Sequence, residues 1–265
     1  MKTINWHRFK LAFCLCGLMV SCFLAAPVNA QIFDSGPSNP ALFDNVFNLP
    51  GGSFNPSAGG STQLNVFDGA TIGSGGFTIN GIELNVSGGN VGSGGFTARL
   101  SELNISGGDV GSGGFTLGNG SVLNLSGGEA GSGGFTVESG GILNLSGGEA
   151  GNGGFTVESG GLLNLSGGAF GSGGSNISSG SQVNIFGTEF FLQGSPLVLT
   201  DGVPFTINDR GVNLRGTLLD GESFNIFLGA SNTATFTVSQ PVPEPSSLIV
   251  FAFSGAMLLA RRRKA

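Results

Sequence analysis

Apolar residues recur at a fixed spacing through the middle of the chain. Leu-Asn-apolar triplets return every 20 residues, with a single step of 19, and start at Leu64, Leu84, Leu103, Leu123, Leu143, Leu163 and, in a variant copy, Val183. Phe-Thr pairs keep nearly the same phase and start at Phe77, Phe96, Phe115, Phe135 and Phe155. Periods of this length are typical of proteins in which one structural unit stacks on the next. The sequence therefore predicts a stack of similar coils.

Each unit alternates apolar and polar residues in two short stretches, as in GSGGFTVESGGILNLSGGEA, which starts at Gly131. Phe135 and Val137 share one side of the first stretch, and Leu143 and Leu145 one side of the second, which predicts two strands. The glycine pairs after each stretch indicate turns. A third apolar column follows at Ile72, Val91, Val110, Ala130, Ala150 and Phe170. Three inward-facing segments predict a coil with three sides.

A flexible Gly/Ser linker is the competing interpretation, because this unit contains seven glycines and glycine loses much backbone entropy when it is ordered. A linker has no reason to repeat apolar residues in phase, and no charged residue interrupts the inward columns. Neighbouring coils stacked about 4.8 Å apart bury these columns in one core. We therefore predict an all-β fold, a parallel β-helix of about six 20-residue coils over residues 64–186, with outward rows of Thr and hydrogen-bonded Asn.

The repeat with its Ser-Gly-Gly turns resembles the passenger repeats of bacterial autotransporter adhesins, a likeness of pattern that implies this architecture. Both ends of such a stack expose strand edges that invite pairing with other chains, so both are expected to be covered. We expect residues 31–63 to form an N-terminal cap or linker and residues 187–240 to form a C-terminal β cap. Strand-like runs in the latter lie at 197–200, 205–208, 212–219, 223–228 and 233–238.

The first 30 residues have the features of a secretory signal peptide. Basic residues precede an apolar run over 11–26, and small residues lead up to Ala30. This order predicts cleavage between Ala30 and Gln31, and therefore export. Two other outcomes stay open. One is retention as an anchor, for which the run is shorter than the roughly 20 residues of a membrane span; the other is lipoprotein processing at Cys22.

Cleavage at this point changes the composition of the chain, because all three cysteines, the single histidine and the single tryptophan lie before Ala30. The mature chain then has no thiol, which excludes disulfides and thiolate metal sites. Residues 31–240 carry fifteen acidic residues against three arginines, a net charge of −12. Such a surface repels phosphate backbones, so nucleic acid is not an expected partner.

The end of the chain, residues 241–265, has a pattern of three parts. It contains Pro243, Glu244 and Pro245, then an apolar run over 248–260, then Arg261, Arg262 and Arg263. The run is short for a membrane span, but a thin bilayer accommodates it. With the basic cluster on the cytoplasmic side, it predicts a short transmembrane segment that holds the preceding chain outside.

This order of motifs resembles the PEP-CTERM sorting signal. The resemblance implies an exosortase-type sorting machinery as partner, and contact with the membrane through this segment before processing. It also implies a location in the cell envelope, at the cell surface or in the extracellular matrix of a Gram-negative or planctomycete-type bacterium. Removal of the tail and its retention as an anchor both stay open. The signal implies an address and no activity.

Parallel β-helices often carry polysaccharide lyases and hydrolases, so the chain is expected to show their residues if it is an enzyme. A lyase requires carboxylate-bound Ca²⁺ beside a basic residue, and a glycosidase requires two opposed carboxyl groups. Arg99, the only basic residue of the repeats, shares a column with Glu138 and Glu158 and lies about 10 Å, or two coils, from Glu138. This fits a surface arginine. Because the mature chain has no histidine to activate a hydroxyl group, we expect no catalytic site.

Acidic residues recur in register at Asp109, Glu129 and Glu149, in the column that begins with Asn90. Like charges about 5 Å apart repel each other, and a bridging Ca²⁺ would relieve that repulsion. The Gly-rich run lacks the Asp of the calcium-binding nonapeptide. A solvated acidic face is therefore the favoured interpretation, with Ca²⁺ as the open alternative, and no metal or cofactor site is assigned.

We therefore expect a structural or adhesive surface protein, a short β-helical rod that presents polar ladders to exopolysaccharide or to like chains. The alternative is a polysaccharide-active β-helix enzyme, a lyase or a hydrolase. An enzyme requires a groove with clustered carboxylates, whereas a structural rod requires only even ladders. The surface of the folded chain distinguishes the two.

Overall fold

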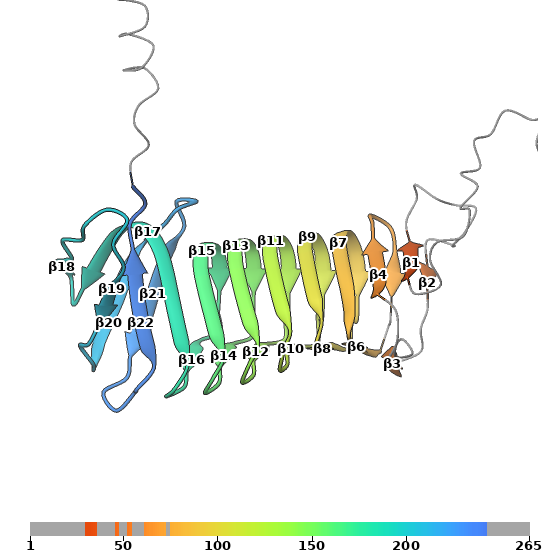
Figure 1. Cartoon of the computed structure of the whole chain (residues 1–265), viewed down its shortest axis with the longest axis horizontal. Coiled ribbons are helices and arrows are strands. Elements are labelled where there is room, and N and C mark those ends of the chain that lie inside the picture. The colour runs from red at the N-terminus through yellow and green to blue at the C-terminus, as the bar shows by residue number, and fades with distance from the viewer. Residues whose placement is uncertain (1–29, 36–45, 48–51, 55–60, 73–74, 243–265) are drawn as a thin grey trace, which may run out of the picture.

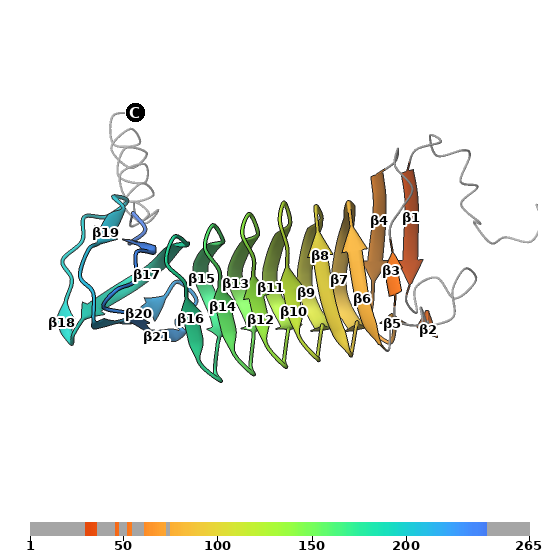
Figure 2. The same ribbon diagram turned by 90° about the horizontal axis from the view of Figure 1, so that it is seen from below.

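The protein is a rod of parallel β-coils that ends in a small, partly antiparallel unit (Figures 1 and 2). The computed structural model describes residues 30–35, 46–47, 52–54, 61–72 and 75–242. Within these residues every regular element is a strand. About six turns follow one another at a spacing of roughly 20 residues, which confirms the predicted parallel β-helix.

One sheet of 15 strands runs the length of the rod and carries the Leu-Asn-Leu stretches. Neighbouring coils pair in parallel and in register, so that Asn124 lies opposite Asn144. In the repeats its strands are β4 (Ser61–Val66), β7 (Ile82–Val91), β9 (Glu102–Val110), β11 (Val122–Ala130), β13 (Ile142–Ala150), β15 (Leu162–Phe170) and β17 (Gln182–Leu192), with β5 (Thr71–Ile72) beside β7.

A second sheet of seven strands carries the Phe-Thr stretches on another side of the rod. It is also parallel and in register, with Phe115 opposite Phe135. Its strands in the repeats are β6 (Gly76–Asn80), β8 (Gly95–Arg99), β10 (Phe115–Leu117), β12 (Phe135–Val137), β14 (Phe155–Val157) and β16 (Ser175–Ile177).

The third apolar column lies on the same strands as the leucine column. Strands β11 and β13 continue through Ser-Gly-Gly with register shifts, and they end on the buried Ala130 and Ala150. The glycine pair after Leu-Asn-Leu is therefore a bend inside a strand, and the turn predicted there is wrong. A β-bulge re-aims a strand without ending its pairing, which lets two strands supply three inward columns.

Inward side chains stack like on like and form one core along the rod. The ring centroids of Phe115 and Phe135 are 4.7 Å apart, with planes inclined by 4°, and those of Phe135 and Phe155 are 5.5 Å apart. On the long sheet Leu123 and Leu143 are completely buried. Each buried side chain of this size contributes about 1.5 to 3 kcal/mol, an amount that conformational entropy largely offsets. Stability therefore depends on the stacking of many coils.

The Ser-Gly-Gly bends bring the backbones of successive coils into direct contact. Gly128 has a φ of 77°, and a Cβ at this position would lie 2.5 Å from the carbonyl oxygen of Gly108. Both the backbone conformation and the available space therefore require glycine.

The N-terminal end continues the stack ahead of the first full repeat. Strand β1 (Ala30–Ser35) pairs in parallel with β4, β2 (Val46–Phe47) with β5, and β3 (Gly52–Phe54) with β6. The described parts of residues 31–63 thus belong to the same two sheets as the repeats.

At the other end the chain folds back over the last coil. Strand β17 extends beyond the repeat and pairs antiparallel with β18 (Ser195–Pro196) and with β20 (Val212–Leu218), which in turn pairs with β21 (Ser223–Leu228). Strand β22 (Thr235–Ser239) pairs in parallel with β17 and adds one more layer to the stack. Strand β19 (Phe205–Ile207) then pairs antiparallel with β22.

Four of the five strand-like runs predicted in this region hold a strand, but the run 197–200 has no regular structure. Leu197 and Leu199 pack against the core while Val198 is almost fully exposed, so the alternation of a strand is present. Only one backbone hydrogen bond, from Leu197 N to Phe190 O, ties the run to β17. Alternation predicts which side chains face inward, but a strand also needs a partner strand for its ladder of hydrogen bonds.

Arg210 fastens this C-terminal unit from within. Its guanidinium lies 5.7 Å over the ring of Phe236. It also donates hydrogen bonds of 2.7 to 2.8 Å to the carbonyl oxygens of Ile207, Asp209, Asn232 and Ala234. Ile207 ends β19 and Asp209 follows it, whereas Asn232 and Ala234 precede β22, so one side chain holds β19 and β22 together.

Candidate binding surfaces of the rod

A ladder of asparagine side chains follows the outer face of the long sheet. The Nδ2 of each donates to the Oδ1 of its counterpart in the preceding coil, at 2.7 to 3.0 Å. The members are Asn65, Asn85, Asn104, Asn124, Asn144, Asn164 and Asn184. An internal amide such as Asn124 uses one N–H and one oxygen lone pair in the ladder, which leaves a second N–H and a second lone pair for a ligand. The predicted amide ladder is confirmed.

Beside this ladder lies a groove of about 330 Å³, which we call the Asn–Ser groove. It is lined by Asn65, Phe67, Asn85, Val86, Ser87, Asn104, Ile105, Ser106, Asn124 and Ser126. The serine hydroxyls donate to the preceding coil, as from Ser126 Oγ to the carbonyl oxygen of Ile105 at 3.4 Å. Their lone pairs stay available as acceptors. The groove therefore offers both donors and acceptors at each coil.

Phenylalanine stands at both ends of the serine column. The residue after the Leu-Asn-apolar triplet is serine in the five middle coils, at Ser87, Ser106, Ser126, Ser146 and Ser166. In the first coil it is Phe67, which lines the groove, and in the last coil it is Phe186, which is 38% exposed. Six coil steps separate the two, or about 29 Å at the usual strand spacing. Sequence reasoning missed this pair, although the exception to serine was visible in the repeat.

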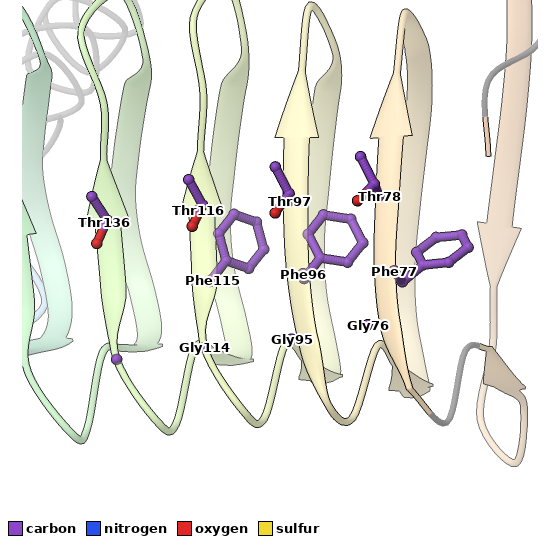
Figure 3. A pocket seen from close by; sticks show the side chains of 11 residues that line it. Gly76, Phe77, Thr78, Gly95, Phe96, Thr97, Gly114, Phe115, Thr116 and Thr136 are labelled. Carbon is purple, nitrogen blue, oxygen red and sulfur yellow. The ribbon is translucent and has the colours of Figure 1, made fainter. Parts of the chain in front are cut away.

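A second groove, of about 760 Å³, lies on the short sheet (Figure 3). It is lined by Gly76, Phe77, Thr78, Gly95, Phe96, Thr97, Gly114, Phe115, Thr116, Gly134 and Thr136. The predicted threonine row stands beside a strip of glycines that carries no side chains. Its chemistry is limited to hydroxyl and backbone hydrogen bonding.

The acidic column lies where the repeat places it. Asp109 is in register with Asn90 and Glu129, and Glu129 with Glu149. Asn152 Nδ2 donates to Glu129 Oε1 at 2.7 Å. In the described part of the chain no three His, Cys, Asp or Glu residues gather in a group that could hold a metal ion. Neither the solvated face nor a bridging Ca²⁺ is tested by this arrangement.

Arg99 and Glu138 converge over Gly118. A Cβ on Gly118 would lie 3.1 Å from Arg99 Cγ and 3.2 Å from Glu138 Oε2. Leu100, next to Arg99, has a φ of 50° and is 65% exposed. The other coils have a glycine of positive φ at this position, at Gly81, Gly120, Gly140, Gly160 and Gly180.

The predicted sorting residues lie outside the described structure, whereas the two predicted cleavage residues lie inside it. Pro243, Glu244, Pro245, Arg261, Arg262 and Arg263 lie outside the described residues, as does the apolar run 248–260. Ala30 and Gln31 begin β1, and cleavage between them stays a prediction. Among the described residues no helix is long and apolar enough to span a bilayer.

Comparison with protein families identifies the C-terminal segment. Residues 241–264 match the model of the PEP-CTERM protein-sorting motif. The chain carries a PEP-CTERM sorting signal. The motif marks an exported bacterial protein that exosortase sorts to the cell surface, which confirms the resemblance seen in the sequence. No curated protein and no solved structure matches the chain.

The described surface of the chain offers ladders of hydrogen-bonding groups along both sheets. The linings of the two grooves contain amides, hydroxyls, glycines and apolar side chains, and neither lining includes a carboxylate or a basic group. Such surfaces can hold a ligand by repeated hydrogen bonds.

Proposed function

We propose that this exported protein is a structural or adhesive rod that binds neutral linear glycans of the envelope or exopolysaccharide matrix along the Asn–Ser groove. The observation that carries the proposal is the even ladder of amides and hydroxyls that ends in Phe67 and Phe186. A sugar ring presents hydroxyl groups that donate and accept, and an apolar face that packs against aromatic rings. The amide N–H groups and lone pairs complement the sugar hydroxyl groups, and the two phenylalanines complement the apolar face of the sugar ring.

The direction of the ladder favours a polymer over a small ligand. Equivalent groups recur about every 4.8 Å along the rod, a step comparable to the advance of one sugar in an extended glycan. Each coil contributes only a weak contact, but contacts that form together raise the overall affinity. The groove itself extends from Phe67 to Ser126. A chain bound in it packs on Phe67, and it reaches Phe186 only if it continues along the ladder past Leu219, whose N–H donates to the carbonyl oxygen of Ser166.

The charge of the rod favours neutral over acidic glycans. Residues 31–240 carry a net charge of −12. Glu129 lies on the same strand as Ser126 of the groove, and Asp109 and Glu149 flank it in the neighbouring coils. A polyuronate laid along the groove would be repelled by this column.

The composition of the grooves also supports a role without catalysis. A glycosidase needs two carboxyl groups about 5 to 9.5 Å apart across the scissile bond, and the lining of each groove contains none. A polysaccharide-active enzyme is the alternative function, and no observation on the described surface favours it.

Affinity electrophoresis of the full chain, through gels that contain hydroxyethyl cellulose, a neutral linear glucan, or alginate, a polyuronate, tests the proposal. We expect retardation by the neutral glucan and none by alginate. The double variant Phe67→Ala, Phe186→Ala should weaken binding about thirtyfold, because each of the two aromatic contacts contributes roughly 1 kcal/mol and about 1.4 kcal/mol corresponds to a factor of ten.

Phe227→Ala is the matched control, since Phe227 is 60% exposed on β21 and away from the groove. It should leave retardation unchanged. Migration unaffected by the neutral glucan, or an equal loss with Phe227→Ala, would contradict the proposal. New reducing ends in the glucan after incubation would favour the enzymatic alternative.

A further inference from the structure

The turns that follow the Phe-Thr strands form a ridge along the rod. This turn ridge consists of residues 80–81, 99–100, 118–120, 138–140 and 158–160 in five successive coils. Most of its residues are Gly, Ser or Asn, which keeps the ridge low. Arg99 and Leu100 break this pattern, in the one coil whose triplet follows after 19 residues.

Leu100 is held in a backbone conformation that suits glycine. Its φ of 50° falls in the left-handed region, which is unfavourable for a residue with a Cβ. The side chain is 65% exposed, so burial within the chain does not offset this strain. Strained residues that persist at a surface point to a role in recognition.

Charges on the turn ridge are ordered along the rod. Arg99 is exposed and is the only basic residue of the repeats. Glu138 and Glu158 lie two and three coils further on in the same column, and Asn80 lies one coil before. Gly118 lies between the basic and the acidic residues of this column, and the side chains of Arg99 and Glu138 converge over it.

We propose that two copies of this chain associate side by side and antiparallel through the turn ridge, about a two-fold axis at Gly118 and Asn119. Rotation about this axis places each column of ridge residues opposite the same column of the second copy. The order of the coils is reversed between the two copies. Arg99 then faces Glu138 of the second copy, and Asn80 faces its Glu158. Leu100 meets the low Ser139 and Gly140.

The self-complementarity of the turn ridge is the reason to choose a second copy as the partner. A two-fold contact must pair each residue with its own counterpart in reverse. Here every charged group meets an opposite charge or an amide, and Asn119 meets its own copy. The contact is narrow and therefore weak in dilute solution, but chains sorted to one surface meet at a high local concentration. The contact is independent of the proposed glycan binding and leaves the Asn–Ser groove open.

Charge exchange tests the pairing between copies. In sedimentation equilibrium of the full chain in detergent, R99E and E138R should each weaken self-association at least tenfold, because each variant places like charges opposite one another. An equimolar mixture of the two should associate again, since one copy then carries both acids and the other both arginines. R215E is the matched control on the cap, where Arg215 is exposed. If R215E has the same effect as R99E, or if the mixture stays monomeric, the contact is overturned.

Cross-linking tests the position of the axis. In a chain with Cys14, Cys16 and Cys22 replaced by serine, N119C should form an intermolecular disulfide under mild oxidation, because its two copies adjoin at the axis. S159C lies on the same ridge but two coils from the axis, and it should not cross-link. Equal cross-linking of the two variants, or none with either, overturns the proposal. A monomeric protein that still binds neutral glucan would exclude this contact alone and leave the proposed function in place.

Discussion

The repeat stack, residues 64–186, and the C-terminal cap, residues 187–240, are stabilised in different ways. In the stack the same contact is made in coil after coil, as by the rings of Phe115 and Phe135. In the cap each contact occurs once. Asp220, for example, accepts a hydrogen bond from the backbone N–H of Gly168 and so ties the β20–β21 turn to the last bend of the stack. Repetition spreads stability over many equivalent side chains, whereas the aperiodic end concentrates it in a few.

The largest effect is expected inside the stack, from Phe135→Ala. The variant leaves a cavity between Phe115 and Phe155, and these rings cannot close it because the strand spacing fixes their separation. Loss of a buried phenylalanine costs about 3 to 5 kcal/mol where the site cannot collapse. Chemical denaturation of the purified protein measures this change. A loss below about 1 kcal/mol would show that the coils adjust freely and that the phenylalanine column is not a rigid core.

The next effect is expected in the cap, from Arg210→Ala. It removes four hydrogen bonds to carbonyl oxygens and leaves these groups without the guanidinium. We expect a loss of about 2 to 4 kcal/mol, since hydrogen bonds to a charged group contribute more than neutral ones but do not add fully. Amide exchange should accelerate in β19 and β22 while the stack keeps its protection.

Arg215→Ala, at an exposed position of β20, is the control and should change stability by no more than about 0.5 kcal/mol. If Arg210→Ala accelerates exchange equally in the stack and in the cap, the two regions unfold as one unit and the contrast between them does not hold.

The repeats could be predicted because each inward position is specified several times. A leucine or phenylalanine that recurs at one phase in five coils outweighs the high glycine content, and the asparagine ladder follows from the same phase. The bend inside the long strand could not be predicted in this way. A glycine pair between two apolar columns fits a turn and a bulge equally well, and only the pairing of Glu129 with Glu149 beyond it shows that the strand continues.

The cap shows where local sequence fails. Residues 236–238 have the sequence Phe-Thr-Val, which also forms strands of the short sheet. Here, however, they pair with β17 in the long sheet. Phe236 lies over Val183 of the leucine column. The same three residues suit either sheet, so the free edge of β17 decides their place. Similarly, Phe67 and Phe186 interrupt the regular serine column. A search for residues that recur in every repeat overlooks these exceptions, although they are the residues that suggest binding.

A smaller effect is expected on the surface of the stack, from Asn124→Ala. Asn124 donates to Asn104 and accepts from Asn144, both at 2.8 Å. Removing both bonds from a half-buried position should cost about 1 to 2 kcal/mol. Thr116→Ala, an outward substitution on the short sheet, should change the free energy of unfolding by less than about 0.5 kcal/mol. Equal losses for the two variants would mean that the amide ladder adds nothing to stability and serves binding alone.

The smallest effect, and the one of opposite sign, is expected from Leu100→Gly. Glycine removes the cost of a left-handed backbone, about 1 to 2 kcal/mol, and adds about 0.5 to 1 kcal/mol of backbone entropy to be lost on folding. The net result should be a gain of about 0.5 to 1 kcal/mol in chemical denaturation, together with weaker self-association in sedimentation equilibrium. Gly140→Leu places the same strain in another coil and should reverse the sign of the stability change. If Leu100 lowers the stability of the folded chain but strengthens self-association, its role is in the contact between the two chains. If Leu100→Gly is destabilising instead, the cover that the leucine provides over Gly120 outweighs its strain, and its exposure no longer requires a partner.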